Sequence, residues 1–199
     1  MFNYRGVVCS KAQSDEELVR LHLQGDLEAF RELVGRYTGA MYNLAYRYTA
    51  DRMAAEDIAQ ETFLRVYQAL PRSRLELPFK PWLFRIAVNL CRDWAARKRP
   101  LAFAQLGNED DSLVESIPDE EPLPLERVEA GELEEMVRQA VAELAPPYRV
   151  AITLRYTEGL SYQQMAEVLD IPLNTVRTHL FRAKQRLRQV LERWWGGGK

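Results

Sequence analysis

Residues 161–189 read SYQQMAEVLDIPLNTVRTHLFRAKQRLRQ, and this stretch governs the interpretation of the whole chain. Ser161 and Gln164 have the spacing of a capping box, in which each side chain satisfies a free backbone N–H of the first helical turn. A helix is therefore expected to begin at Ser161. Pro172 is tolerated at the start of a helix but not inside one, so a tight turn into a second helix is expected there. The pattern predicts a helix-turn-helix.

The second of these helices is expected to bury one stripe and to present a basic face. The stripe has spacings of four, three and four: Val176, Leu180, Ala183 and Leu187. Residues 172–190 contain five Arg and Lys residues and no acid. The predicted DNA-binding positions combine side chains that bond base edges with cations that hold phosphates: Asn174, Thr175, Arg177, Thr178, Phe181, Arg182 and Lys184. A basic face that is simply exposed to water is the simpler alternative. The capping box, the turn, the buried stripe and the absence of acids together favour a DNA-binding helix.

Charge is strongly separated along the chain although the net charge of its 199 residues is only −2. Between residues 100 and 135 there are twelve acids and a single cation, Arg127. Such composition is typical of a linker. We therefore predict an all-α protein in which an N-terminal helical bundle and a C-terminal helix-turn-helix domain are joined by a flexible acidic linker. The expected division is a mobile tail (1–13), the first domain (14–99), the linker (100–131) and the second domain (132–195).

Metal, disulfide and membrane chemistry find no support in the sequence. The two cysteines, Cys9 and Cys91, are far apart, and the two histidines lie in different segments, so no zinc-site or disulfide spacing exists. No apolar run approaches the length of a membrane-spanning helix, and the N-terminus lacks a signal-peptide pattern. We expect no metal, no cofactor, no membrane insertion and a cytoplasmic location.

Residues 52–70 predict a helix with two contrasting faces. At 100° per residue, apolar side chains gather on one side, and Asp57, Gln60 and Glu61 gather on the other. Periodicity alone favours simple exposure of this second face to water.

Residues 72–99 are rich in cations, with aromatic residues among them. Eight Arg and Lys residues stand against two acids, and Trp82, Phe84 and Trp94 are interspersed. Rings that stack on bases and cations that pair with phosphates suit single-stranded nucleic acid. Taken one by one, the aromatic residues fit a protein core equally well.

Four motifs occur in order along the chain: GDLEAF at 25–30 with Tyr37, AEDIAQETF at 55–63, WLFRIAVN at 82–89, and LSY at 160–162 with TVRT at 175–178. With these motifs the chain, from about residue 14 to 192, resembles a bacterial RNA polymerase sigma factor of the extracytoplasmic-function group.

The resemblance implies a dissociable subunit of RNA polymerase. Its first domain would read the promoter −10 element as single-stranded DNA, and its second would read the duplex −35 element. Asp57, Gln60 and Glu61 would bind core polymerase. This replaces the earlier interpretation, in which their face of the helix was simply exposed to water. Asn89 would line a pocket for a flipped base. Cations near it would hold phosphates: Lys80, Arg85, Arg92, Arg97, Lys98 and Arg99. An anti-sigma protein is a further implied partner.

Two other functions compete with this one. A helix-turn-helix regulator that never engages polymerase would explain residues 161–189 but not the motifs at 55–63 and 82–89. A helical enzyme acting on nucleic acid would need clustered carboxylates for a metal, or an activated nucleophile. Asp57 and Glu61 do share a helix face, but no histidine or glycine-rich phosphate loop accompanies them. We therefore expect no enzymatic activity.

Overall fold

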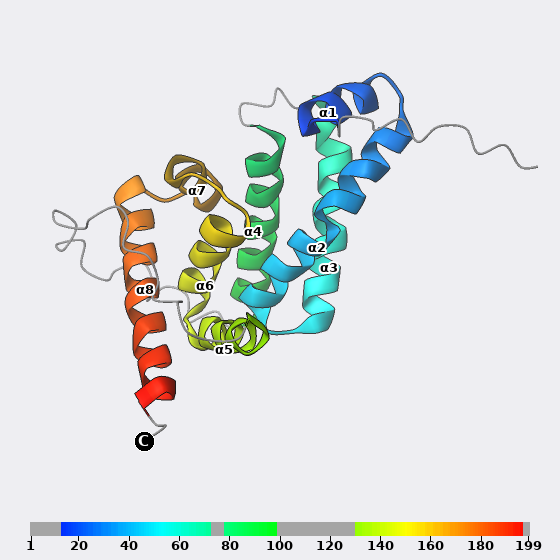
Figure 1. Cartoon of the computed structure of the whole chain (residues 1–199). Coiled ribbons are helices and arrows are strands. Elements are labelled where there is room, and N and C mark those ends of the chain that lie inside the picture. Colours follow the sequence, from blue (N-terminus) through cyan, green and yellow to red (C-terminus); the bar gives the residue numbers. More distant parts are fainter. Residues whose placement is uncertain (1–12, 73–77, 99–129, 197–199) are drawn as a thin grey trace, which may run out of the picture.

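The computed structural model describes residues 13–72, 78–98 and 130–196 (Figure 1), and the side chains of the last range from 136 to 194. Every regular element in these ranges is helical, which confirms the predicted all-α class. The expected N-terminal tail lies outside the described residues except for residue 13. The expected linker lies outside them except for residues 130–131.

The N-terminal half is a bundle built around α2 (Leu27–Thr49), α3 (Arg52–Ala69) and α4 (Phe79–Lys98). The shorter α1 (Asp15–Leu23) and the 3₁₀ turn η1 (Leu70–Arg72) complete it. Side chains cap the first three helices: Ser14 accepts from the N–H of Glu17, Asp26 from that of Glu28, and Asp51 from that of Ala54. Each cap satisfies a backbone donor that has no partner within its helix.

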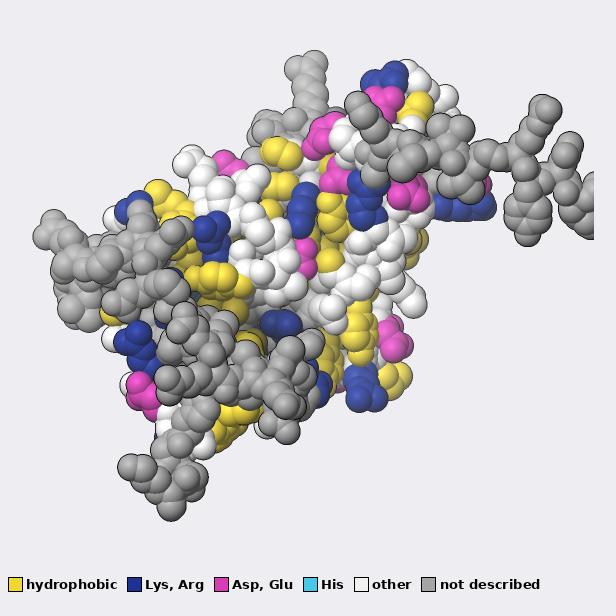
Figure 2. Space-filling view, viewed as in Figure 1, with side chains coloured by type: hydrophobic (Ala, Val, Ile, Leu, Met, Phe, Trp, Pro, Cys, Tyr) yellow, Lys and Arg dark blue, Asp and Glu magenta, His cyan; other side chains and the backbone are white. Residues whose placement is uncertain are grey.

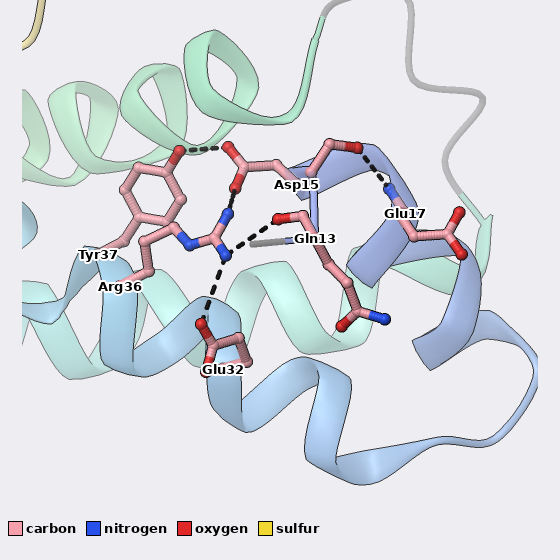
Figure 3. A network of polar contacts seen from close by, with 7 residues as sticks. Gln13, Asp15, Glu17, Glu32, Arg36 and Tyr37 are labelled. Carbon is pink, nitrogen blue, oxygen red and sulfur yellow. Dashed lines mark hydrogen bonds and ion pairs between the residues drawn. The ribbon is translucent and has the colours of Figure 1, made fainter. Parts of the chain in front are cut away.

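A polar network ties α1 to α2 (Figure 3). Arg36 Nη1 lies 2.5 Å from Asp15 Oδ1, and the Tyr37 hydroxyl donates to the other oxygen of the same carboxylate. Arg36 also donates to the carbonyl of Gln13 at 3.1 Å. Burial, helped by Asp15, raises the pKa of Tyr37 above its usual value, so its phenol remains a donor. The start of α1 is thereby fixed against the middle of α2.

The C-terminal half contains α5 (Ala130–Glu143), α6 (Pro146–Ile152), α7 (Tyr162–Leu169) and α8 (Leu173–Gly196). The predicted capping box at the start of α7 is present. Ser161 Oγ accepts from the N–H of Gln164 at 3.2 Å, and Gln164 Oε1 accepts from the N–H of Ser161 at 2.9 Å. Asp170, in a left-handed conformation with φ 51°, ends α7. The predicted helix-turn-helix is therefore confirmed.

Between α6 and α7 the chain forms a π-helical segment, η3 (Thr153–Thr157). Its hydrogen bonds reach one residue further than in an α-helix, as in the bond from the N–H of Glu158 to the carbonyl of Thr153 at 3.0 Å. Gly159 follows with φ +70°, a backbone conformation that residues other than glycine rarely adopt. The sequence pattern around residues 148–156 gave no indication of this wider turn.

The two halves pack directly on one another, and we call their interface the seam. Helix α4 contacts α7, and α2 contacts α6. In Figure 1, α4 stands between α2 and α3 on one side and α6 and α7 on the other. The buried apolar side chains of both halves form one continuous cluster. Burial of this kind is the main favourable term in packing, so the seam is part of the folded structure.

We predict that Ser161→Ala lowers the free energy of unfolding by about 1 kcal/mol, whereas Ser161→Gly lowers it by only a few tenths. Alanine removes the side-chain acceptor, while glycine leaves the backbone N–H groups open to water. Urea unfolding of the three proteins measures the difference. Equal losses for both variants would contradict a capping role for the hydroxyl.

Candidate nucleic-acid interface

Helix α8 carries the predicted recognition surface on the side away from its buried stripe. Val176, Leu180, Ala183 and Leu187 are all buried, as expected. Among the predicted DNA-binding residues Asn174 is exposed, and five others are half-buried: Thr175, Arg177, Phe181, Arg182 and Lys184. The structure therefore exposes Asn174 near the start of α8 and half-buries the three predicted cations that follow it.

Thr178 differs from the prediction. We expected it to face outward, but it is only 6% exposed, and its hydroxyl donates to the carbonyl of Asn174 at 3.0 Å. A hydroxyl within a helix often satisfies itself on the carbonyl one turn earlier, which removes it from the surface. The expected outward orientation of Thr178 is thus wrong for this structure.

Helix α8 also contains a histidine whose charge is suppressed. The His179 ring meets Tyr148 edge-on, with 5.6 Å between ring centroids. Burial, and secondarily the nearby Arg182, lowers the pKa of His179. Lys184 Nζ lies 5.8 Å from the centroid of the Tyr156 ring, a cation–π distance. The basic charge of α8 comes from Arg and Lys residues, since His179 stays neutral.

Helix α4 separates its predicted DNA-binding residues onto different faces. Arg85, Asn89 and Arg92 follow one another at spacings of four and three, so they share a face. Arg85 and Asn89 are exposed. Lys98 pairs with Asp51 at 3.0 Å and lies over the Trp94 ring, and Arg99 is outside the described residues. The structure therefore brings three of the seven predicted residues into one row.

Two more α4 cations, Arg97 and Lys80, hydrogen-bond to main-chain carbonyls, and the aromatic residues of α4 pack in or against the core. Arg97 donates to the carbonyl of Asp93, one turn earlier, while Lys80 reaches into the seam. Phe84 is fully buried, and Trp82 and Trp94 pack half-buried against the core. For Phe84 the core interpretation is correct.

The predicted polymerase-binding face lies on α3. Asp57 and Gln60 are exposed, and Glu61 pairs with Arg65 at 2.9 Å. Two apolar side chains that the sequence analysis overlooked share this face, because Met53 and Leu64 lie four residues from Asp57 and Gln60, respectively. Met53 is 76% and Leu64 57% exposed. The apolar residues within the polar stripe could have indicated this surface from the sequence. Exposed surfaces that mix apolar and polar side chains are typical of protein interfaces.

The described ranges were also searched for a metal site, a membrane-spanning helix and a reactive cysteine. They contain no cluster of three or more His, Cys, Asp or Glu side chains suited to a metal ion. No helix among the residues that the structure describes is long and apolar enough to cross a membrane. Cys91 is buried, and burial raises the pKa of its thiol to about 12, so it stays protonated. Figure 2 shows basic side chains singly or in small groups among apolar and acidic ones.

The arrangement defines an all-helical protein with a helix-turn-helix and a second surface of mixed polar and apolar side chains. Comparison with known proteins is more specific. The family Sigma-70 region 2 matches residues 33–100, and Sigma-70, region 4 matches residues 134–187. The ECF RNA polymerase sigma factor SigW of Bacillus subtilis is 35% identical over 84% of this chain and 91% of its own length. The RNA polymerase sigma-H factor of Pseudomonas aeruginosa is 35% identical over 90% and 95%.

Solved structures show the same fold. CnrH in complex with the cytosolic domain of CnrY has a TM-score of 0.61 and 25% identity, covering 90% of this chain and 98% of that one. RpoE of Bartonella quintana, in complex with the anti-sigma factor NepR, has a TM-score of 0.60 at 19% identity, covering 83% and 98%. The chain belongs to the extracytoplasmic-function RNA polymerase sigma factors. It is therefore a transcription initiation factor, and the regulator that never engages polymerase is set aside.

We predict that His179 makes the protein less stable as pH falls from about 7.5 to 5. Its pKa is lowered in the folded state, so below about 6.5 the unfolded chain takes up a proton that the folded chain does not, which favours unfolding. In the His179→Gln variant, the fall in unfolding free energy over this range should be smaller. Urea unfolding at both pH values measures it, and parallel losses in the two proteins would refute the role of His179.

Proposed function

We propose that this sigma factor divides its work among three helix surfaces. The α3 face contacts core polymerase, the exposed row on α4 contacts the single-stranded −10 element, and α8 contacts the duplex −35 element. The observation that carries the proposal is the placement of apolar Met53 and Leu64 among Asp57 and Gln60 on an exposed face. A protein that bound only DNA would have no use for such a face.

At the −10 element, Asn89 is proposed to contact a base turned out of the stack. Extruding a base costs a few kcal/mol, which polar edge contacts and stacking offset. Arg85 stands one turn before Asn89, where it would hold the adjacent backbone. Arg92 completes the row, and three further cations are proposed to contact phosphates around it: Arg97, Lys98 and Arg99. Lys80 is proposed for the same role once it is free of its partner in the seam.

At the −35 element, the first two turns of α8 are proposed to enter the major groove. Asn174, Thr175 and Arg177 have donors and acceptors that suit base edges, and Arg182 and Lys184 lie one and two turns further along, where phosphates are expected. Phe181 offers an apolar contact, for which a thymine methyl group is a suitable partner. Thr178 would contribute only if its hydroxyl left the Asn174 carbonyl.

The remaining expectations concern partners and place. We propose that the chain acts in the cytoplasm, without enzymatic activity of its own and without metal or cofactor. We also propose an anti-sigma partner that covers the α3 face in resting cells. RpoE of Bartonella quintana, which shares the fold, was solved in complex with an anti-sigma factor, NepR. Purification from resting native cells without any second protein bound would count against that partner.

The decisive experiment is transcription in vitro with core RNA polymerase on fragmented genomic DNA, with and without this chain. We expect specific start sites only when the chain is present, and alignment of the upstream DNA should give both promoter elements. Duplex binding by the chain with no new start sites would contradict the proposed division of work.

We predict that Asp57→Asn weakens binding to core polymerase by about two- to tenfold, because a charge at the edge of an interface contributes roughly 0.5–1.4 kcal/mol. Glu16→Gln is the matched control, since Glu16 is likewise an exposed acid but belongs to α1, outside the α3 face. Fluorescence anisotropy of labelled chain measures both affinities. Equal effects of the two variants would remove Asp57 from the proposed contact.

We predict that Arg177→Ala costs about 1–3 kcal/mol in promoter binding and relaxes preference at one −35 base pair, as loss of a base-edge contact does. Competition binding with single-base promoter variants measures this. If instead affinity falls evenly across all sequences and the salt dependence drops by about one unit of slope, Arg177 holds a phosphate and does not read a base.

A further inference from the structure

An open hollow of about 540 Å³ lies at the turn of the helix-turn-helix. Every residue that lines it lies between 163 and 173, so α7, the turn and the start of α8 form it without help from the rest of the chain. A volume of this size is typical of sites that bind ligands. The lining combines four apolar residues with two acids: Ala166, Ile171, Pro172 and Leu173, and Glu167 and Asp170.

The apolar part of the hollow is held in place but remains partly open to water. Ala166 and Ile171 are half-buried and pack against the core on their inner side. The N–H of Ile171 donates to the carbonyl of Ala166 at 3.2 Å, which fixes the turn against the end of α7. Pro172 is exposed, and Leu173 is half-buried. A partner could therefore bury more apolar surface here without refolding the chain, and such burial favours association.

The two acids of the hollow have no cationic partner within the chain. Neither Glu167 nor Asp170 forms an ion pair with any residue that the structure describes. Arg92 reaches the end of α7, but it donates to the main-chain carbonyl of Leu169 and to neither carboxylate. Both negative charges are therefore uncompensated.

Both acids also stand where electrostatics disfavours them. Glu167 lies in the last turn of α7, which has no basic residue, and Asp170 is its C-cap. The carboxyl end of a helix disfavours negative charge, and like charges three residues apart on a helix repel one another. Asp170 has φ 51°, a conformation that asparagine also adopts, so the backbone does not require a carboxylate there. Folding thus gains nothing from these two charges.

The hollow borders the proposed duplex contact. Leu173 is followed directly by Asn174 and Thr175, which are proposed to enter the major groove. Uncompensated carboxylates at this edge repel DNA phosphates and weaken the contact. A cationic segment in the hollow would neutralise them, and the same segment would be attracted to the DNA beside it. Charge complementarity therefore favours a basic occupant that binds DNA at the same time.

We propose that the hollow docks a basic, partly apolar segment of a second protein that is bound to the DNA next to the −35 element. An arginine or lysine of that segment pairs with Glu167 and Asp170, and an apolar side chain covers Ile171 and Pro172. Each protein then favours binding of the other, because the neutralised acids no longer oppose the DNA. This inference rests on the proposed contact of α8 with duplex DNA.

The first test measures peptide binding without DNA. The probes are three labelled synthetic peptides of equal length, composed of arginine and leucine, of arginine and serine, and of glutamate and leucine. Fluorescence anisotropy gives their affinities for the full-length chain and for Glu167→Gln, Asp170→Asn and Glu192→Gln. Glu192→Gln is the matched control, since Glu192 is an exposed acid on α8 without an ion pair among the described residues. It lies about 27 Å further along the helix than Asn174.

We expect the arginine–leucine peptide to bind most tightly. Glu167→Gln and Asp170→Asn should each lower its affinity about two- to fivefold, the range expected for loss of one partly exposed ion pair. Glu192→Gln should leave the affinity unchanged. All three variants remove one negative charge, so the comparison cancels the general effect of net charge. Urea unfolding should show Glu167→Gln and Asp170→Asn to be at least as stable as wild type, because unfavourable charges are removed.

The second test measures the same four proteins on a labelled duplex that carries the −35 element, without peptide. Glu167→Gln and Asp170→Asn should bind it about twofold more tightly than Glu192→Gln. This is the size expected for one unit charge about 10 Å from a phosphate in water. The gain should shrink as salt is added, because salt screens exposed charges.

Three results would overturn the proposal. The arginine–serine or glutamate–leucine peptide could bind as tightly as the arginine–leucine peptide, so that either the apolar or the cationic part is not recognised. Glu192→Gln could lose as much peptide affinity as the other variants, which would leave only general attraction. Glu167→Gln and Asp170→Asn could show no gain on the duplex, which would exclude a partner bound to the adjacent DNA.

Failure of the proposed function has a different outcome. If α8 does not contact the −35 duplex, none of the four proteins distinguishes that duplex from one of unrelated sequence. The peptide titration contains no DNA, so it still shows whether the hollow binds a basic, apolar segment.

Discussion

The packing of α4 is the constraint on which the rest of the structure depends. Its apolar residues Phe79, Leu83 and Phe84 are fully buried and close the N-terminal bundle. Its cations must then project from the remaining faces, and long cationic side chains avoid burial unless they are paired. Such side chains need electronegative partners. The C-terminal half supplies two, the carboxylate of Glu158 for Lys80 and the main-chain carbonyl of Leu169 for Arg92.

Features encoded by nearby residues could be predicted from the sequence, whereas features formed by distant residues could not. The capping box, the turn at Pro172 and the buried stripe of α8 all depend on neighbours within two turns, and the structure contains each of them. In the seam, Lys80 meets a residue 78 positions away in the sequence and Arg92 meets one 77 positions away. Helical periodicity relates only residues within a few turns, so it could not predict these contacts. Thr178 was misplaced because periodicity does not include the bond of its hydroxyl to its own helix. Met53 and Leu64 were overlooked because the polar residues around them dominated the pattern.

The near-zero net charge has a consequence for how DNA is found. With 27 basic and 29 acidic residues, the chain as a whole exerts little attraction on DNA at long range. Attraction has to come from short segments such as α8, and it is strong only at close approach. The free protein is therefore poorly suited to searching DNA alone. Delivery by a large partner that already binds DNA fits this distribution of charge.

The extra residue in the π-helical turn η3 makes chain length a determinant of the architecture. Deleting a single residue between 153 and 157 would restore α-helical hydrogen bonding and rotate everything beyond it by about 100°. Glu158 would turn away from α4, and α7 and α8 would swing with it. Most substitutions in this segment leave that phase unchanged. Evolution can therefore vary the side chains of this turn more freely than the number of residues in it.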